Sequence, residues 1–252
     1  IDNCTYNMTA QNVTNGWNDN TAGLVINAVQ KNGWVYSVRK TYDNKEGYLI
    51  RYDYKTNKQV AVSQKVIASD IEVGSETAAI FTYGDNVYLY NKTQQKWLSL
   101  PLLFETGAEL TPVSNLPIDL GDYAAAGKFE NIYVFEDLGL VAVYVDGKIV
   151  TLKDGVVQNT YTVSKAGKNR MGGGKNGYLY YTTNADYYKK SNTTFNLKVI
   201  VINVKNGNIV NASLSNALTS DDDSFAVSSI FELDSKLFYT LFTWNGGTKS
   251  CM

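Results

Sequence analysis

Short runs of alternating apolar and polar residues recur along the chain and predict a protein built from β-strands. The alternation is plainest in residues 33–39, 48–54, 86–90, 131–135, 138–145 and 197–204. A period of two places one side chain in a core and the next in solvent, which is the pattern of a half-buried strand. No stretch longer than about two turns repeats with the helical period of 3.6 residues. The sequence therefore predicts an all-β fold.

Asparagine or aspartate followed by glycine marks the ends of several such runs. These pairs are Asn32-Gly33, Asp146-Gly147, Asn176-Gly177 and Asn206-Gly207. Both central residues of a tight hairpin turn take positive φ, which Asn, Asp and Gly tolerate best. We therefore expect a two-residue hairpin turn at each pair.

A longer repeat combines a small-residue strand, a polar turn and an aromatic strand. The small-residue segments are 22–24, 78–80, 124–127, 171–174 and 226–229, and the aromatic segments are 34–36, 87–89, 132–134, 178–180 and 237–239. The matching residues Tyr36, Tyr88, Tyr133, Tyr180 and Phe238 are spaced by 52, 45, 47 and 58 positions. A period of about 50 residues is the length of one four-stranded propeller blade.

The chemistry of the repeat fits a β-propeller. Small residues suit inner strands that crowd around a central channel, and large apolar residues suit the contacts between blades. Hairpins at 48–62, 140–152 and 197–214 supply outer strands. We predict one β-propeller domain over residues 1–252 with five blades, and residues 1–13 complete the last blade because too few residues follow its aromatic strand. A β-sandwich is the alternative.

The two cysteines and the glycosylation motifs indicate the cellular compartment of the protein. Cys4 and Cys251 lie near opposite ends of the chain, and a disulfide between them would latch a ring closed by strands from both termini. Disulfides persist in oxidising compartments, whereas two unpaired thiols are the alternative. Six Asn-x-Ser/Thr motifs begin at Asn3, Asn7, Asn12, Asn91, Asn192 and Asn211. Together these features predict a secreted or cell-surface glycoprotein.

Composition removes several classes of function. The chain has 23 basic and 24 acidic residues, so it lacks the basic surface of a nucleic-acid-binding protein. It has no histidine, which removes Ser-His-Asp and Cys-His catalysis and histidine-ligated zinc. No apolar run approaches the roughly 20 residues that span a bilayer, so we expect no membrane insertion within this chain. No leader precedes Ile1, and we interpret the chain as a mature protein or an excised domain. We expect neither a cofactor nor a metal.

Several segments together resemble a known family. They are Asn-Gly-Trp-Val-Tyr at 32–36 with 48–53 and 55–56, Lys-Asn-Arg-Met at 168–171 running into 177–180, and 229–230 followed by 234–238. In order and character these segments are similar to the olfactomedin domain, a secreted five-bladed propeller whose ends are joined by a disulfide. The resemblance implies the same fold for most of the chain.

The same family holds calcium in its channel with two aspartates, an asparagine and backbone carbonyls. Asn169 and Ile230 match the asparagine and one carbonyl position, but Gly74 and Phe231 stand where the aspartates would be. Calcium requires several hard oxygen ligands, usually with negative charge. The resemblance therefore implies the fold without the metal.

Without histidine, an enzyme would have to use carboxylates, and five-bladed propellers do host glycosidases with a channel Asp/Glu pair. Acids near the predicted inner strands are the candidates, and solvated loop acids are the alternative reading: Asp70, Glu72, Glu76, Asp122, Glu130 and Glu232. Trp17 lies in a polar loop and is the candidate for a surface contact with a protein or a sugar ring.

We therefore expect a non-catalytic recognition or adhesion module that binds an extracellular protein or glycan. The first alternative is a structural subunit, or one domain, of an extracellular assembly or filament, which would associate with itself. The second is a carbohydrate-active, glycosidase-like enzyme that uses channel carboxylates.

Overall fold

The computed structural model describes residues 23–41, 43–53, 55–56, 58–74, 77–125, 127–163, 170–182, 188–189, 195–216, 224–243 and 247–251. Almost every element in these ranges is a β-strand, and the one α-helix among them, α1 (Ala68–Ile71), has four residues. None of the helices in these ranges has the length and apolar character needed to cross a membrane. The predicted all-β class is confirmed.

The described strands form five antiparallel sheets of four or more strands and one small hairpin. The first sheet contains β1 (Gly23–Lys31), β2 (Trp34–Thr41), β3 (Glu46–Asp53) and β4 (Lys58–Val62), with β5 (Val66–Ile67) beside β3. The second contains β8 (Ile80–Tyr83), β9 (Asn86–Asn91), β10 (Lys96–Pro101) and β11 (Thr111–Val113). The third contains β12 (Asn131–Phe135), β13 (Leu140–Val145), β14 (Lys148–Lys153) and β15 (Val156–Thr162). The fourth contains β16 (Arg170–Gly173), β17 (Tyr178–Thr182), β19 (Phe195–Asn203) and β20 (Ile209–Asn216). The fifth contains β18 (Tyr188–Lys189), β21 (Ser224–Leu233), β22 (Lys236–Thr243) and β23 (Gly247–Cys251). The hairpin is β6 (Glu72–Gly74) with β7 (Thr77–Ala78).

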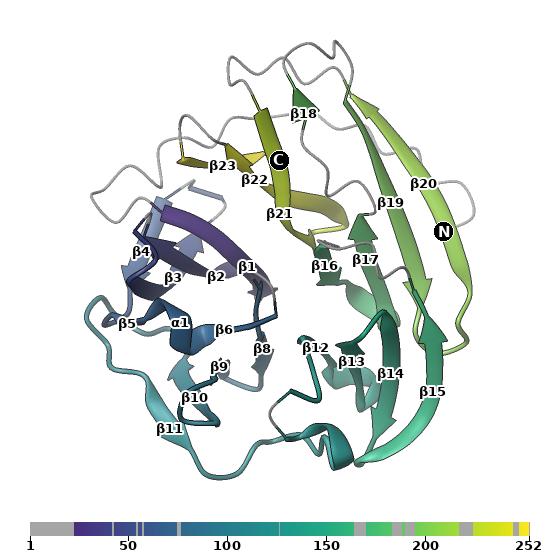
Figure 1. Ribbon diagram of the computed structural model, residues 1–252, viewed down its shortest axis with the longest axis horizontal. Helices are drawn as coiled ribbons and strands as arrows, with labels where there is room; N and C mark the ends of the chain where they lie inside the picture. The colour runs from purple at the N-terminus through teal and green to yellow at the C-terminus, as the bar shows by residue number, and fades with distance from the viewer. Residues whose placement is uncertain are drawn as a thin grey trace.

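One strand of each sheet lies near the middle of the molecule, and the other strands lead outward (Figure 1). These inner strands are β1, β8, β12, β16 and β21. Strand β1 packs against β8, β8 against β12, β12 against β16, β16 against β21, and β21 against β1. Sheets that radiate from a common middle in this way make a propeller-like fold.

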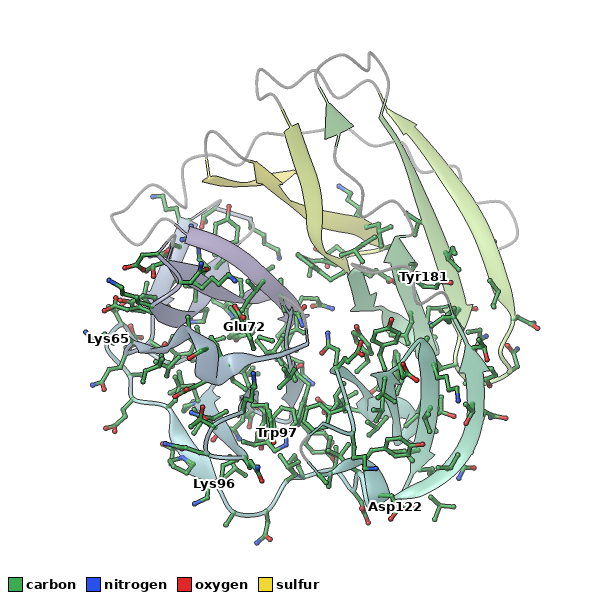
Figure 2. All side chains as sticks on the ribbon, viewed as in Figure 1. Lys65, Glu72, Lys96, Trp97, Asp122 and Tyr181 are labelled. Atoms are coloured by element: carbon green, nitrogen blue, oxygen red, sulfur yellow. The ribbon has the colours of Figure 1, made fainter. Side chains whose placement is uncertain are left out.

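Large apolar side chains fill the spaces between neighbouring sheets. Between the second and third sheets, the Trp97 ring lies 5.0 Å from Phe81 and 5.8 Å from Phe129, and Tyr90 meets Phe129 edge-on at 4.9 Å. Trp97 is labelled in Figure 2 at this interface. Similar apolar clusters join the first sheet to the second, the third to the fourth, and the fifth to the first. Burial of aromatic area between sheets is the main favourable contribution to this packing.

Two of the four predicted two-residue hairpin turns are confirmed, at Asn32-Gly33 and at Asp146-Gly147, where both residues have positive φ. Asn176 and Gly177 also have positive φ, but the prediction of a two-residue turn there is wrong, because four residues that include the 3-10 helix η3 (Lys175–Gly177) join β16 to β17. The prediction at Asn206-Gly207 is wrong, because only Gly207 has positive φ and a five-residue connection joins β19 to β20. There the Gly207 N–H donates to the Asn203 carbonyl at 2.7 Å, which closes a longer loop.

The third predicted repeat is displaced by one strand. Residues 124–127 were expected to form an inner strand, but they follow the 3-10 helix η1 (Gly121–Tyr123) and form no strand in the part described. The predicted aromatic strand, now β12, is itself the inner strand. Residues 140–152 therefore form the middle strands β13 and β14 rather than an outer hairpin, whereas 48–62 and 197–214 do pair as β3–β4 and β19–β20.

The predicted closing strand at residues 1–13 lies outside the described residues, as does Cys4. The second edge of β23, where that strand would pair, has no partner among the described strands. The N-terminal contribution to the last blade and the single-domain boundary at 1–252 therefore stay predictions.

Candidate binding cavity

A cavity of about 550 Å³ opens at the carboxyl ends of the inner strands. Every inner strand contributes to its wall, through Ala28–Lys31 of β1, 80–82 of β8, 132–135 of β12, 172–173 of β16, and Phe231 and Leu233 of β21. Because these strands come from five different sheets, the cavity lies where the sheets converge. Its volume is within the usual range of small-ligand sites, roughly 300–1,000 Å³.

The wall of the cavity is tight on the side of β16 and β21. A Cβ atom added at Gly172 would overlap the backbone carbonyl of Ile230, so only glycine allows these two strands to lie so close together. Gly174 is similarly closed in by the Tyr180 ring and the Glu232 carboxylate. The small-residue inner strand predicted at 171–174 is thus present as β16, and Gly172 lets it pack closely on β21.

Tyr133 contributes a buried phenol to the wall. Its ring belongs to the apolar cluster between the third and fourth sheets, and the Asn131 amide donates to its hydroxyl at 3.1 Å. Burial raises the pKa of Tyr133 far above its ordinary value, with the Asn131 hydrogen bond opposing the shift weakly. This hydroxyl is therefore a neutral hydrogen-bonding group across the physiological range rather than a base.

Turns that follow the inner strands supply a polar rim. Asn32, Asn176 and Asp234 occupy positive-φ turn positions, at 52°, 60° and 49° respectively, and all three line the cavity. Asp137 comes from the 3-10 helix η2 (Glu136–Leu138), and Lys55 comes from the turn between β3 and β4. The rim therefore offers charges of both signs and two amides at the mouth of the cavity.

Glu136 joins three sheets at this rim. Its Oε1 atom lies 2.6 Å from the Lys31 ammonium at the end of β1, and the Gly84 N–H in the β8–β9 turn donates to the same oxygen at 3.2 Å. Lys31 and Glu136 are 105 positions apart in the chain. The carboxylate thus fixes the rim of the cavity by holding the first, second and third sheets together.

Of the acids predicted to face the channel, those that the structure describes do not line this cavity. Glu72 pairs with the Lys40 ammonium at 2.7 Å, Asp70 accepts from the Thr93 hydroxyl at 2.7 Å, and Glu232 accepts from the Tyr180 hydroxyl at 2.6 Å. Asp122 is exposed at the margin of the molecule in Figure 2, and Glu130 is half-buried beside β13. Glu76 lies outside the described residues.

The acids that do line the cavity are Glu136, Asp137 and Asp234. Sequence reasoning missed them because it searched near the small-residue strands rather than in the turns that follow the inner strands. The acidic triplet at residues 221–223 lies outside the described residues.

Positions inferred from the family resemblance to be near calcium do not form a metal centre in the described part. Phe231 lines the cavity, Ile230 is buried against Gly172, Gly74 ends β6, and Asn169 lies outside the described residues. Within the described ranges, no group of three or more His, Cys, Asp or Glu side chains is placed to hold a metal ion.

Most of the predicted modification and contact sites lie outside the described residues: Asn3, Cys4, Asn7, Asn12, Trp17 and Asn192. The backbone of Asn211 lies in β20 and that of Cys251 ends β23. Asn91 is 4 % exposed, and its Oδ1 accepts from the Gln94 N–H at 2.9 Å, so this turn would have to open to admit a sugar. The disulfide, the glycosylation sites and the Trp17 contact stay predictions.

The fold and the axial cavity together define an all-β, propeller-like protein. Comparison with solved structures agrees at the level of the fold. Glutaminyl cyclase from Myxococcus xanthus superposes with a TM-score of 0.50 at 9% identity, over 92% of this chain and 91% of that one. A GH43_1 enzyme from Xanthomonas citri gives 0.48 at 11% identity over 97% and 89%, and a DUF4221 protein from Bacteroides vulgatus gives 0.48 at 10% over 97% of both chains.

The similarity to the Myxococcus xanthus enzyme shows the fold alone, because an identity of 9% carries no function. No family model matches the sequence. No curated protein matches it either.

Proposed function

We propose that the chain is a closed five-bladed β-propeller that acts outside the cell as a non-catalytic recognition module. In this proposal the partner, an extracellular protein or a glycan, places a small polar group in the axial cavity. The observation that supports the proposal is the cavity itself, which collects residues from five inner strands and is rimmed by charges and amides on turns. Propeller turns of this kind are positioned by a rigid scaffold, which suits them to binding.

The packing of the inner strands supports the ring. Contacts run from β1 to β8, then to β12, β16 and β21, and from β21 back to β1. A disulfide between Cys4 and Cys251 would latch the ring next to β23, and the glycosylation motifs would belong to the same oxidising compartment.

The disposition of the cavity carboxylates favours binding over hydrolysis. Oε1 of Glu136 is held by Lys31 and by the Gly84 N–H, so this carboxylate serves the scaffold. Asp137 and Asp234 lie on exposed turns at the mouth of the cavity, where a carboxylate can accept hydrogen bonds from a hydroxyl or an ammonium group of a ligand. A ligand rich in such donors, as sugars and basic peptides are, fits this rim.

Binding to an oligosaccharide array, followed by calorimetry with the strongest hit, tests the proposal. Asp137→Arg places a large cation at the rim, and we expect it to weaken binding at least tenfold. Glu109→Arg makes the same charge change at an exposed residue that does not line the cavity, and it should bind like the parent chain. Equal loss in both variants, or in neither, contradicts a site in the cavity.

A hydrolysis screen on the same oligosaccharides separates recognition from catalysis. The recognition module should bind without releasing reducing sugar. Release that disappears in Asp137→Asn or Asp234→Asn would replace our proposal with a carbohydrate-active enzyme.

A further inference from the structure

The outer strand of the third sheet, β15, has an unusual surface. Its sequence is Val-Val-Gln-Asn-Thr-Tyr-Thr, with no charge, no proline and no glycine. All of its residues except Tyr161 are exposed, and Val156 and Val157 are 62% and 49% exposed. Edge strands in natural proteins are usually protected by charges, prolines or a covering segment, because a bare edge pairs with other strands.

The backbone of β15 leaves hydrogen-bonding groups directed outward. The Asn159 N–H donates to the Thr151 hydroxyl at 3.1 Å, and the Val163 N–H donates to the Gly147 carbonyl at 2.7 Å, so both face β14. Alternate residues of an antiparallel strand present their N–H and C=O groups to opposite sides. The N–H groups of Thr160 and Thr162 therefore point away from the sheet. A bulge separates Val157 from this regular stretch, which limits the usable edge to Asn159–Thr162.

Another outer edge of the molecule is covered by the chain itself. Beside β4, the Gly107 N–H donates to the Val62 carbonyl at 2.8 Å, and the Gln64 N–H donates to the Ala108 carbonyl at 2.8 Å. Within the described ranges, no strand pairs with the outward side of β15. The exposure of its side chains agrees with an open edge.

The carboxyl end of β15 lies beside two exposed apolar residues of the next sheet. The Tyr161 hydroxyl donates to the Val204 carbonyl at 3.3 Å, and the Tyr161 ring packs on Gly207, so the end of β15 lies beside the β19–β20 connection (Figure 1). Ile209 and Val210, which begin β20, are 48% and 40% exposed. Exposed apolar residues gathered beside an open strand edge are typical of a protein interface.

We propose that the β15 edge pairs with the β15 edge of a second copy of this chain. The two strands run antiparallel about a two-fold axis with Thr160 opposite Thr160, and each Thr160 N–H donates to the carbonyl of the other. The third sheets of the two copies, with four strands each, then form one continuous eight-stranded sheet.

Self-pairing is favoured by the chemistry of the strand. Because β15 carries no charge, a two-fold axis brings no like charges together, and nothing on the strand selects a charged partner. The register places Thr160 against Thr160, which is a favourable cross-strand pair. A two-fold contact is also the commonest way in which identical chains associate.

Sedimentation velocity or light scattering on the full chain tests this inference, at concentrations on the order of 100 μM because a small interface is weak. We expect a reversible dimer. Thr160→Pro removes only an outward N–H and should weaken dimerisation at least tenfold. Thr160→Val keeps the N–H and the branched shape, and it should dimerise like the parent chain.

Thr160→Lys is the control for a folding defect in the proline variant. It leaves the backbone unchanged, and in the dimer it would place two ammonium groups opposite each other. We expect it to be monomeric at low salt with an unchanged melting temperature. A parent chain that remains monomeric overturns the inference, as does dimerisation that Thr160→Pro and Thr160→Lys leave intact.

Discussion

The close approach of β16 and β21 gives the sharpest single-residue prediction. Replacing Gly172 by alanine puts a methyl group where the three nearest atoms, Ile230 O, Ile230 C and Phe231 Cα, all belong to the backbone of β21. A backbone cannot rotate out of the way as a side chain can. The two inner strands would therefore have to move apart, which disturbs the wall of the cavity and the contact between the fourth and fifth sheets.

The size of the effect follows from two opposing contributions. Overpacking a well-packed site costs typically 1–3 kcal/mol and occasionally more, and a rigid obstacle belongs at the upper end, about 3 kcal/mol. Alanine also lowers the conformational entropy of the unfolded chain, which raises the free energy of unfolding by about 0.4–1 kcal/mol. We expect Gly172→Ala to lower the free energy of unfolding by about 2–3 kcal/mol net.

Gly173 supplies a matched control on the same strand. A Cβ there meets no atom within 4 Å and the residue lacks positive φ, so Gly173→Ala should change the free energy of unfolding by no more than about +1 kcal/mol. Urea unfolding followed by circular dichroism measures the free energy of unfolding of both variants, and their melting temperatures should differ by roughly 4–16 °C. Equal stability of the two variants would refute the close approach of β16 to β21.

Three further predictions concern other parts of the scaffold. A double-mutant cycle on Lys31→Met and Glu136→Gln should give a coupling of about 0.5–1 kcal/mol that shrinks in high salt, and no coupling would mean that the ion pair does not hold the rim. Phe129→Ala should cost about 3–5 kcal/mol and alter tryptophan fluorescence, because the ring packs on Trp97; unchanged unfolding would contradict this packing. The Thr56 hydroxyl lowers the pKa of Asp53 below its ordinary value of 3.8, so this carboxylate adds stability above that pH and loses it as the pH falls through the lowered pKa. Asp53→Asn should therefore flatten the loss of unfolding free energy between about pH 5 and about pH 2, and an unchanged acid profile would argue against the effect.

Features that depend on local backbone chemistry could be predicted from the sequence. Asn32-Gly33 and Asp146-Gly147 form the expected turns because positive φ at both positions selects these residue types almost alone. The small residues at 171–174 predict an inner strand, and Gly172 in β16 lies so near the backbone of β21 that only glycine fits there. The alternation of apolar residues located β2, β3 and β19 within a few positions of their ends.

Residue composition led to a wrong prediction at residues 124–127, because the same small residues suit both an inner strand and a tight turn. Residues 124–127 have the small side chains of an inner strand, yet Gly121 has a φ of 51° and η1 precedes the segment, so the chain turns there. The next aromatic segment, β12, then becomes the inner strand of the third sheet. Side-chain size alone could not separate a crowded strand from a tight turn.

The rim of the cavity could not be predicted because it depends on contacts between distant segments. Nothing near Lys31 in the sequence indicates that Glu136 will be its partner. The first turn of the third sheet is a short 3-10 helix rather than a two-residue turn, and this difference brings Glu136 and Asp137 to the cavity. Such placements follow from the order of the sheets around the middle.

Non-reducing peptide mapping of the protein purified from its native source tests our proposal of a closed extracellular propeller most directly. Our account predicts one cross-linked pair of peptides that contains Cys4 and Cys251, separated by reduction, together with added mass on peptides that carry glycosylation motifs. Two free thiols in that protein, with no added mass on any of those peptides, would contradict both the latch and the compartment.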